Sequence, residues 1–153
     1  MANGYSYSGL LEENVKWLAD KHFLVDCTPQ YQPGIHGENG ELIKIDLFVP
    51  AVINSEQFPG GFYVECKFQD VNGTAYKNTE YDFRKIRSYY NLPTFAVIEG
   101  NESEPIKKIA ARTLGGNFRN YMNLFGFSKL CHDIKSGCDI KPGDLHGQKK
   151  MFG

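Results

Sequence analysis

Hydrophobic residues recur along the first part of the chain with the period of an amphipathic helix. Leu11, Val15 and Leu18 stand at i, i+4 and i+7, which places them on one helical face. Ser8 precedes this stretch, and two glutamates follow within the first turns, the arrangement of an N-cap and an acidic helix start. We therefore predict a helix from about Gly9 to Lys21, with Ser8 as its N-cap.

Strand patterns follow. Residues 22–27 read as a short strand, and residues 42–49 alternate between apolar and polar positions until Pro50. Residues 62–69 alternate in the same way, and residues 94–98 form a continuous apolar run that is typical of a buried strand. The pattern predicts three strands, a helix and a fourth strand.

Helices are predicted between and after these strands. A helix that starts near Asn78 or Thr79 and ends before Pro93 precedes the apolar run at 94–98. Residues 106–114 and 118–125 predict two short helices. The fold class that follows is α/β, with a mixed central β-sheet flanked by helices in the order αβββαβ. Its core covers about residues 8–100, within a single domain over 1–153.

Composition narrows the class of protein. With 41% hydrophobic and 14% aromatic residues, the 153-residue chain has the content of a folded globular domain rather than a disordered one. No apolar run reaches the ~18 residues that span a bilayer. The first residues lack the basic and apolar regions of a secretory signal, so we expect an intracellular protein.

The charge is small overall but uneven. The net charge is −1, which alone argues against a nucleic-acid partner. Residues 1–75 carry 4 basic and 10 acidic residues, whereas residues 76–153 carry 13 basic and 8 acidic ones. The halves are therefore −6 and +5, and such asymmetry indicates a polyanion partner or an acidic site.

Three residues on the predicted strands form a candidate catalytic group. Glu65 and Lys67 are two apart on one strand, so their side chains leave the same face. If the strand at 42–49 pairs with it, Asp46 can bring its carboxylate to that of Glu65. Two neighbouring carboxylates repel unless a cation joins them, and Mg²⁺ typically binds one or two carboxylates plus water or phosphate. The arrangement suits metal-assisted attack on a phosphate.

The series Asp46…Glu65-x-Lys67 resembles the signature of the PD-(D/E)xK nucleases, with Ile45 where the family has proline. The segment from Gln69 to Lys77, with Gly-Thr-Ala inside it, is similar to some phage and restriction-type members. Residues 8–15 resemble the acidic helix of phage junction-resolving endonucleases. At 100° per residue, Glu12 flanks the apolar stripe and Glu13 points away, so Glu12 is the candidate ligand.

The resemblance implies a restriction-endonuclease-like fold and a Mg²⁺-dependent DNA endonuclease, with Mn²⁺ as a substitute, in a prokaryote or phage-infected cell. It assigns catalysis to Asp46, Glu65, Lys67, Glu12 and Gln69. It assigns the metal to Asp46, Glu65, Glu12 and the Cys66 backbone carbonyl. Basic residues after the motif are expected to bind DNA phosphates: Lys77, Arg84, Lys85, Arg87, Lys107, Lys108, Arg112 and Arg119.

Alternative functions remain open at this point. We expect a homodimer or homotetramer that cuts specific DNA sites, as homing and restriction enzymes do. A structure-selective Holliday-junction resolvase would carry the same residues, and so would a non-catalytic DNA-binding or assembly subunit that retains the fold. An isolated E-x-K can also be an exposed ion pair worth well under ~1 kcal/mol.

The cysteines offer a weaker alternative site. A zinc site would need ligands of the Cys and His type, and the chain has four such residues near its end: Cys131, His132, Cys138 and His146. Their spacing lacks a C-x₂₋₄-C pair, so ordinary loop residues are the favoured interpretation. An iron–sulfur cluster would need Cys27 and Cys66 as well, and Cys66 is expected to face the core.

Overall fold

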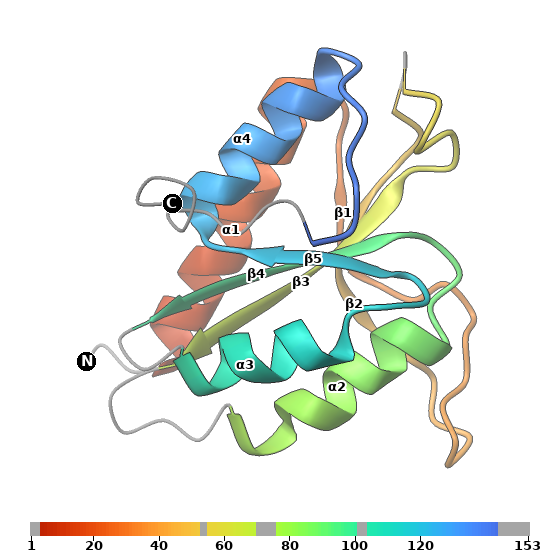
Figure 1. Ribbon diagram of the computed structural model, residues 1–153, viewed down its shortest axis with the longest axis vertical. Coiled ribbons are helices and arrows are strands. Elements are labelled where there is room, and N and C mark those ends of the chain that lie inside the picture. Colours follow the sequence, from red (N-terminus) through yellow and green to blue (C-terminus); the bar gives the residue numbers. More distant parts are fainter. Residues whose placement is uncertain (1–3, 53–54, 70–75, 101–103, 144–153) are drawn as a thin grey trace.

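The structure is a computed structural model, and it describes residues 4–52, 55–69, 76–100 and 104–143, without the side chains of residues 4–8, 76 and 77. The elements follow one another along the chain in this order (Figure 1): α1 (Gly4–Phe23), β1 (Thr28–Tyr31), β2 (Ile45–Val49), β3 (Phe62–Gln69), α2 (Tyr76–Ser88), β4 (Thr94–Gly100), α3 (Glu104–Thr113), β5 (Phe118–Met122) and α4 (Leu124–Lys135). No helix in these ranges is long and apolar enough to cross a membrane.

The strands form one mixed sheet in the order β1-β2-β3-β4-β5. The β1–β2 and β2–β3 pairs are antiparallel, and the β3–β4 and β4–β5 pairs are parallel. Helices α1 and α4 pack together on one face of the sheet, and α2 and α3 pack together on the other (Figure 1). This confirms the predicted α/β class with a mixed sheet flanked by helices.

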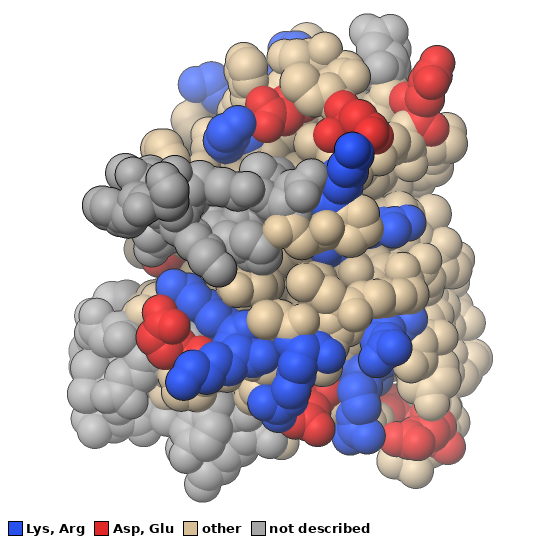
Figure 2. Space-filling view, viewed as in Figure 1, with Lys and Arg blue, Asp and Glu red and all other residues tan. Residues whose placement is uncertain are grey.

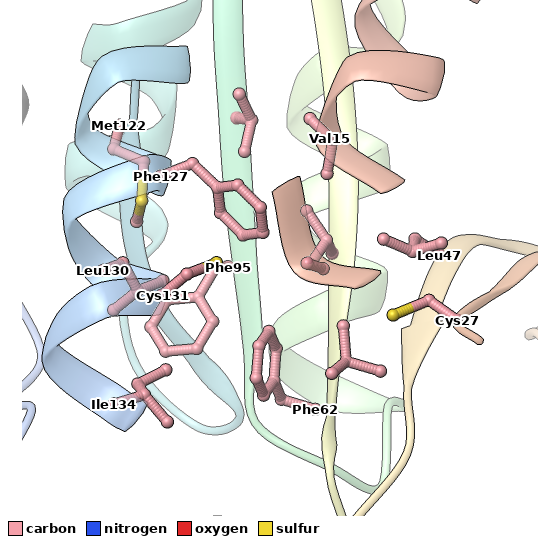
Figure 3. Packing of buried hydrophobic residues seen from close by; sticks show 14 of the residues in the cluster. Val15, Cys27, Leu47, Phe62, Phe95, Met122, Phe127, Leu130, Cys131 and Ile134 are labelled. Atoms are coloured by element: carbon pink, nitrogen blue, oxygen red, sulfur yellow. The ribbon is translucent and has the colours of Figure 1, made fainter. Parts of the chain in front are cut away.

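Two hydrophobic cores lie on the two faces, and β3 contributes to both. Its residues Phe62, Val64 and Cys66 belong to the core under α1 and α4, where Figure 3 shows Phe62 beside Phe95. Tyr63 belongs to the core under α2 and α3. The alternation predicted for residues 62–69 is therefore present, and it directs Glu65 and Lys67 towards the α2–α3 side.

Two predictions near the N-terminus were wrong. Helix α1 begins at Gly4, so Ser8 lies inside it and is not its N-cap. Residues 22–27 form no strand, because α1 continues to Phe23 and the Asp20 carboxylate accepts the Cys27 N–H at 2.8 Å. That hydrogen bond ties the chain into a turn, and the first strand starts at Thr28 instead.

The later helix predictions need correction too. Residues 118–125 are not a helix: residues 118–122 form β5, with Phe118, Asn120 and Met122 buried in alternation. The final helix, α4, starts only after Asn123, whose side chain caps it by accepting the Gly126 N–H. Helix α2 begins at Tyr76, so Asn78 and Thr79 lie within it. The prediction for residues 106–114 agrees with α3.

Candidate active site where β2 and β3 diverge

The two candidate metal-binding carboxylates lie where β2 and β3 stop pairing. The antiparallel ladder runs from Val49 opposite Phe62 to Leu47 opposite Val64. At the next position, the carboxylates of Asp46 and Glu65 make the hydrogen bonds between the two strands in place of backbone carbonyls. Asp46 Oδ2 accepts the Cys66 N–H at 2.8 Å, and Glu65 Oε1 accepts the Asp46 N–H at 3.0 Å. These two hydrogen bonds fix both carboxylates beside the same backbone segment.

Helix α1 and strand β1 bring a third carboxylate to this place. Glu12 is partly buried, whereas Glu13 is exposed, as the helical wheel predicts. The Gln30 side-chain amide donates to Glu12 Oε1 at 2.9 Å and also hydrogen-bonds Asp46. Gln30 takes a left-handed backbone conformation with φ +52°, which is uncommon outside glycine, asparagine and aspartate. It thereby joins the carboxylates of α1 and β2.

Lys67 is held by helix α2. Its ammonium forms an ion pair with the Asp82 carboxylate, and the Lys85 ammonium lies 3.6 Å from the other Asp82 oxygen. The Lys67 and Asp82 side chains are 17% and 23% exposed, so solvent screens this pair only in part. Asp82 fixes the direction of Lys67 on the face that also carries Glu65.

Tyr90 closes the inner side of the site. Its hydroxyl donates to Glu65 Oε1 at 3.3 Å, and its ring packs edge-on against Tyr63 in the core under α2 and α3. Tyr90 is buried, while the neighbouring Tyr89 is 37% exposed.

The carboxylates disfavour each other's charged forms. Burial raises the pKa of Glu65 well above its usual value, and the negative charge of Asp46 raises it further. Burial also raises the pKa of Asp46, against the opposing effects of the Cys66 N–H and Lys67. The pKa of Glu12 rises to about 7 because the group is desolvated and faces Asp46. In the absence of a cation, this cluster resists full ionisation.

The Glu12 shift predicts a pH dependence of stability. A carboxyl whose pKa is raised on folding favours the folded chain most when protonated. Its contribution is therefore complete below about pH 4.5 and is lost as the pH rises through about 7. We expect the Tm in EDTA to fall from pH 5 to pH 8, and to fall less in Glu12→Gln. Glu13→Gln, on the exposed side of α1, should follow the wild type; an equal slope in all three proteins would contradict the shift.

Gln69 ends β3 in a confined position. It is 1% exposed and lies opposite Gly100 of β4. A Cβ on Gly100 would stand 2.1 Å from the Gln69 carbonyl oxygen, and Gly100 has φ +118°. Only glycine allows this approach, so β4 fixes the backbone of Gln69 beside the site. Most of the segment that resembles the Gly-Thr-Ala motif, residues 70–75, lies outside the described residues.

The predicted DNA-binding residues gather mainly on two helices. Figure 2 shows Lys and Arg side chains over α2 and α3 on the face in view. Several of them are paired: Arg112 with Glu80, Lys107 with Glu104 at 3.5 Å, and Lys85 with Asp82. The exposed ones on these helices include Arg84, Arg87 and Lys108. Arg119 lies apart on β5, and the Lys77 side chain is outside the described residues.

The cysteines lie in two different environments. Cys27, Cys66 and Cys131 are buried in the core under α1 and α4, and Figure 3 shows Cys131 among its apolar side chains. Cys138 is exposed, and so is His132, which contacts Asp133. His146 lies outside the described residues. Within the described part of the chain, no three or more His, Cys, Asp or Glu side chains gather as a metal cage.

Three residues of the site were not predicted: Gln30, Asp82 and Tyr90. Asp82 stands three residues before Lys85 on a predicted helix, so the sequence could have predicted an i, i+3 ion pair between them. It could not have predicted that Asp82 contacts Lys67. Tyr90 was readable only as an aromatic residue near a helix end. Gln30 stands between Pro29 and Tyr31, where no sequence signal marks it. All three depend on how separate elements pack together.

No family model matches the sequence, and neither a curated protein nor a solved structure matches it. A proposal of function therefore depends on the residues and contacts described above.

Proposed function

We propose that the protein is a Mg²⁺-dependent DNA endonuclease with a restriction-endonuclease-like core. The observation that carries the proposal is the reciprocal pair of hydrogen bonds at the β2–β3 divergence, which sets the carboxylates of Asp46 and Glu65 beside one another. Lys67 leaves the same face of β3 as Glu65, and Glu12 reaches the site from α1. This is the donor set of metal-assisted phosphodiester hydrolysis.

The residues fit a divalent cation. Four carboxylates influence one another electrostatically here, and the ammonium groups of Lys67 and Lys85 pair with one of them, Asp82; the carboxylates are Glu12, Asp46, Glu65 and Asp82. Mg²⁺ needs only one or two carboxylates and takes water or phosphate at its other positions, so the absence of a larger cage among the described side chains is compatible with it. Asp46 and Glu65 would hold the ion, with Glu12 and the Cys66 carbonyl in support. When bound, Mg²⁺ supplies an activated water and stabilises charge on the phosphate.

Side chains of the protein would stabilise the attacked phosphate and bind the DNA backbone. Lys67, oriented by Asp82, places an ammonium where negative charge develops on the attacked phosphate. Gln69 and Lys77 are proposed to position water or phosphate. The exposed cations of α2 and α3 would neutralise the DNA backbone, which gives affinity without reading sequence. In-line attack by water would then leave a 5′-phosphate.

A cleavage assay tests this proposal. We expect purified wild-type protein to nick or cut DNA with Mg²⁺ or Mn²⁺ and to stop with EDTA. Lys67→Ala should lower the rate about 10²-fold, as loss of a charge-stabilising group does. Lys129→Ala removes an ammonium that is paired with Asp133 on the other side of the molecule, and should cut normally.

The substrates and outcomes separate the alternatives. A plasmid library tests site-specific cutting of the homing or restriction type, and a four-way junction tests a resolvase. If wild-type protein cuts neither form with either metal, the enzyme proposal fails in favour of a non-catalytic subunit. If Lys67→Ala cuts as fast as wild type, the assignment of the site fails.

A further inference from the structure

An apolar stripe runs along the outer face of α1 and continues one residue past its end. Leu10, Trp17 and Leu24 are 53%, 58% and 81% exposed. Leu10 and Trp17 are seven residues apart within α1, close to two helical turns, so they lie in one row. Leu24 follows seven residues later, and its N–H still donates to the Asp20 carbonyl at 2.9 Å, which keeps its backbone in line with the row. The core-facing residues of α1, Leu11, Val15 and Ala19, are buried on a different side of the helix.

The fold does not explain this row. Leu24 directly follows α1 in the left-handed conformation, with φ +56°. Helices commonly end at this position with glycine or asparagine, because other side chains are strained there. Leu24 is therefore strained, and with 81% of it exposed it gains little from burial within a single chain.

We propose that this row is the self-association surface of the protein and that its occupant is the α1 helix of a second copy. The two helices would pack antiparallel, with Trp17 at the two-fold axis. The register is self-complementary, because Leu10 and Leu24 are equally far from Trp17 along the chain. Leu10 of each copy therefore lies level with Leu24 of the other, as a two-fold interface requires.

The charges beside the row favour the same register. Glu13 and Lys21 are both exposed and are each four residues from Trp17, so the antiparallel pairing sets Glu13 of one copy level with Lys21 of the other. Within one chain, the Lys21 ammonium lies over the Trp17 ring, 4.7 Å from its centroid. A parallel pairing would instead oppose Glu13 to Glu13. The net charge of −1 opposes association of two copies only weakly.

The size of the row sets the expected strength. From residue 10 to residue 24 the row extends about 21 Å along the helix axis. A single row of three side chains is a small contact beside the ~800 Å² that each partner buries in a standard interface, so we expect a weak dimer. Glu12 lies about 140° around the helix from Trp17, so both candidate sites would stay accessible in the dimer. This proposal does not depend on the nuclease proposal.

Sedimentation equilibrium and intrinsic fluorescence test it on the full chain. Trp17 is the only tryptophan, so its emission reports directly on the proposed axis. We expect a monomer–dimer equilibrium and a blue shift of the emission over the same concentration range. A wild-type chain that remains monomeric at several hundred micromolar, or a dimer without an emission change, would overturn the proposal.

Substitutions then test the surface and its register. Trp17→Glu should weaken dimerisation at least about 30-fold, as loss of a central aromatic contact does. Phe125→Glu changes a side chain of α4 that is 65% exposed and lies outside the row, and it should dimerise normally. Glu13→Lys and Lys21→Glu should each weaken the dimer, and the double variant should restore it. The proposal fails if Trp17→Glu has no effect or if the single charge reversals leave the affinity unchanged.

Discussion

Replacing Asp46 with asparagine is expected to lower Mg²⁺-dependent DNA cleavage by about 10⁴-fold while the chain stays folded. The substitution removes the charge that would hold the metal, and metal-ion stabilisation is worth several kcal/mol, about 1.4 kcal/mol for each factor of ten. Asparagine keeps an oxygen that can accept the Cys66 N–H, so the connection between β2 and β3 survives. Single-turnover cleavage rates and Tm values in EDTA measure the two effects separately.

The control for this experiment is Asp26→Asn, which changes a carboxylate that is 96% exposed. It should cut DNA at the wild-type rate. We expect the Tm of Asp46→Asn in EDTA to equal or exceed that of the wild type, because burial disfavours the Asp46 charge. Full activity in Asp46→Asn would place the reaction elsewhere. A large fall in its Tm would show that the charge itself holds the strands together.

The largest loss of stability is expected from Phe62→Ala. Phe62 is fully buried and its ring meets those of Phe23, Phe58 and Phe95 at centroid distances of 6.0, 5.5 and 5.3 Å. Removing such a ring leaves a cavity and costs about 3–5 kcal/mol. Urea unfolding should show this as a lower midpoint, and the Tm should fall by roughly 10 °C.

Phe125→Ala provides the comparison, because Phe125 is 65% exposed and its truncation should change stability by less than about 0.5 kcal/mol. Phe62→Leu should fall between the two, since leucine refills part of the cavity. A loss below about 1 kcal/mol for Phe62→Ala would mean that the core under α1 and α4 is less tightly packed than described.

The sequence predicted the centre of the sheet better than its edges. The strand prediction for residues 62–69 was correct because β3 is covered on both faces, and its side chains point alternately into the two hydrophobic cores. The edge strand β1 has four residues and buries none of their side chains, so no apolar alternation marks it in the sequence. The edge strand β5 has five residues, of which three are buried. Residues 118–125 have apolar positions compatible with either period, and the break at Asn123 is set by a cap that depends on local hydrogen bonding.

In the candidate site, too, some contacts could be predicted from the sequence and others could not. The proximity of Asp46 and Glu65 follows from pairing two neighbouring strands, and the position of Glu12 follows from helical geometry, so both are readable from residue spacing. The contacts of Lys67 with Asp82 and of Glu65 with Tyr90 depend on the angle at which α2 crosses the sheet. That angle results from packing of the whole α2–α3 layer, which no local pattern encodes.

The hydrogen bonds at the β2–β3 divergence have a consequence for how homologous chains would diverge. Positions 46 and 65 each supply an acceptor to a backbone N–H, and leaving a buried N–H unpaired costs about 1–3 kcal/mol. Selection for folding alone would therefore retain an oxygen at both positions, satisfied equally by Asn and Gln. A homologue that has lost catalysis would be recognised by amides at these positions rather than by alanines, and retention of both acids would mark selection for charge.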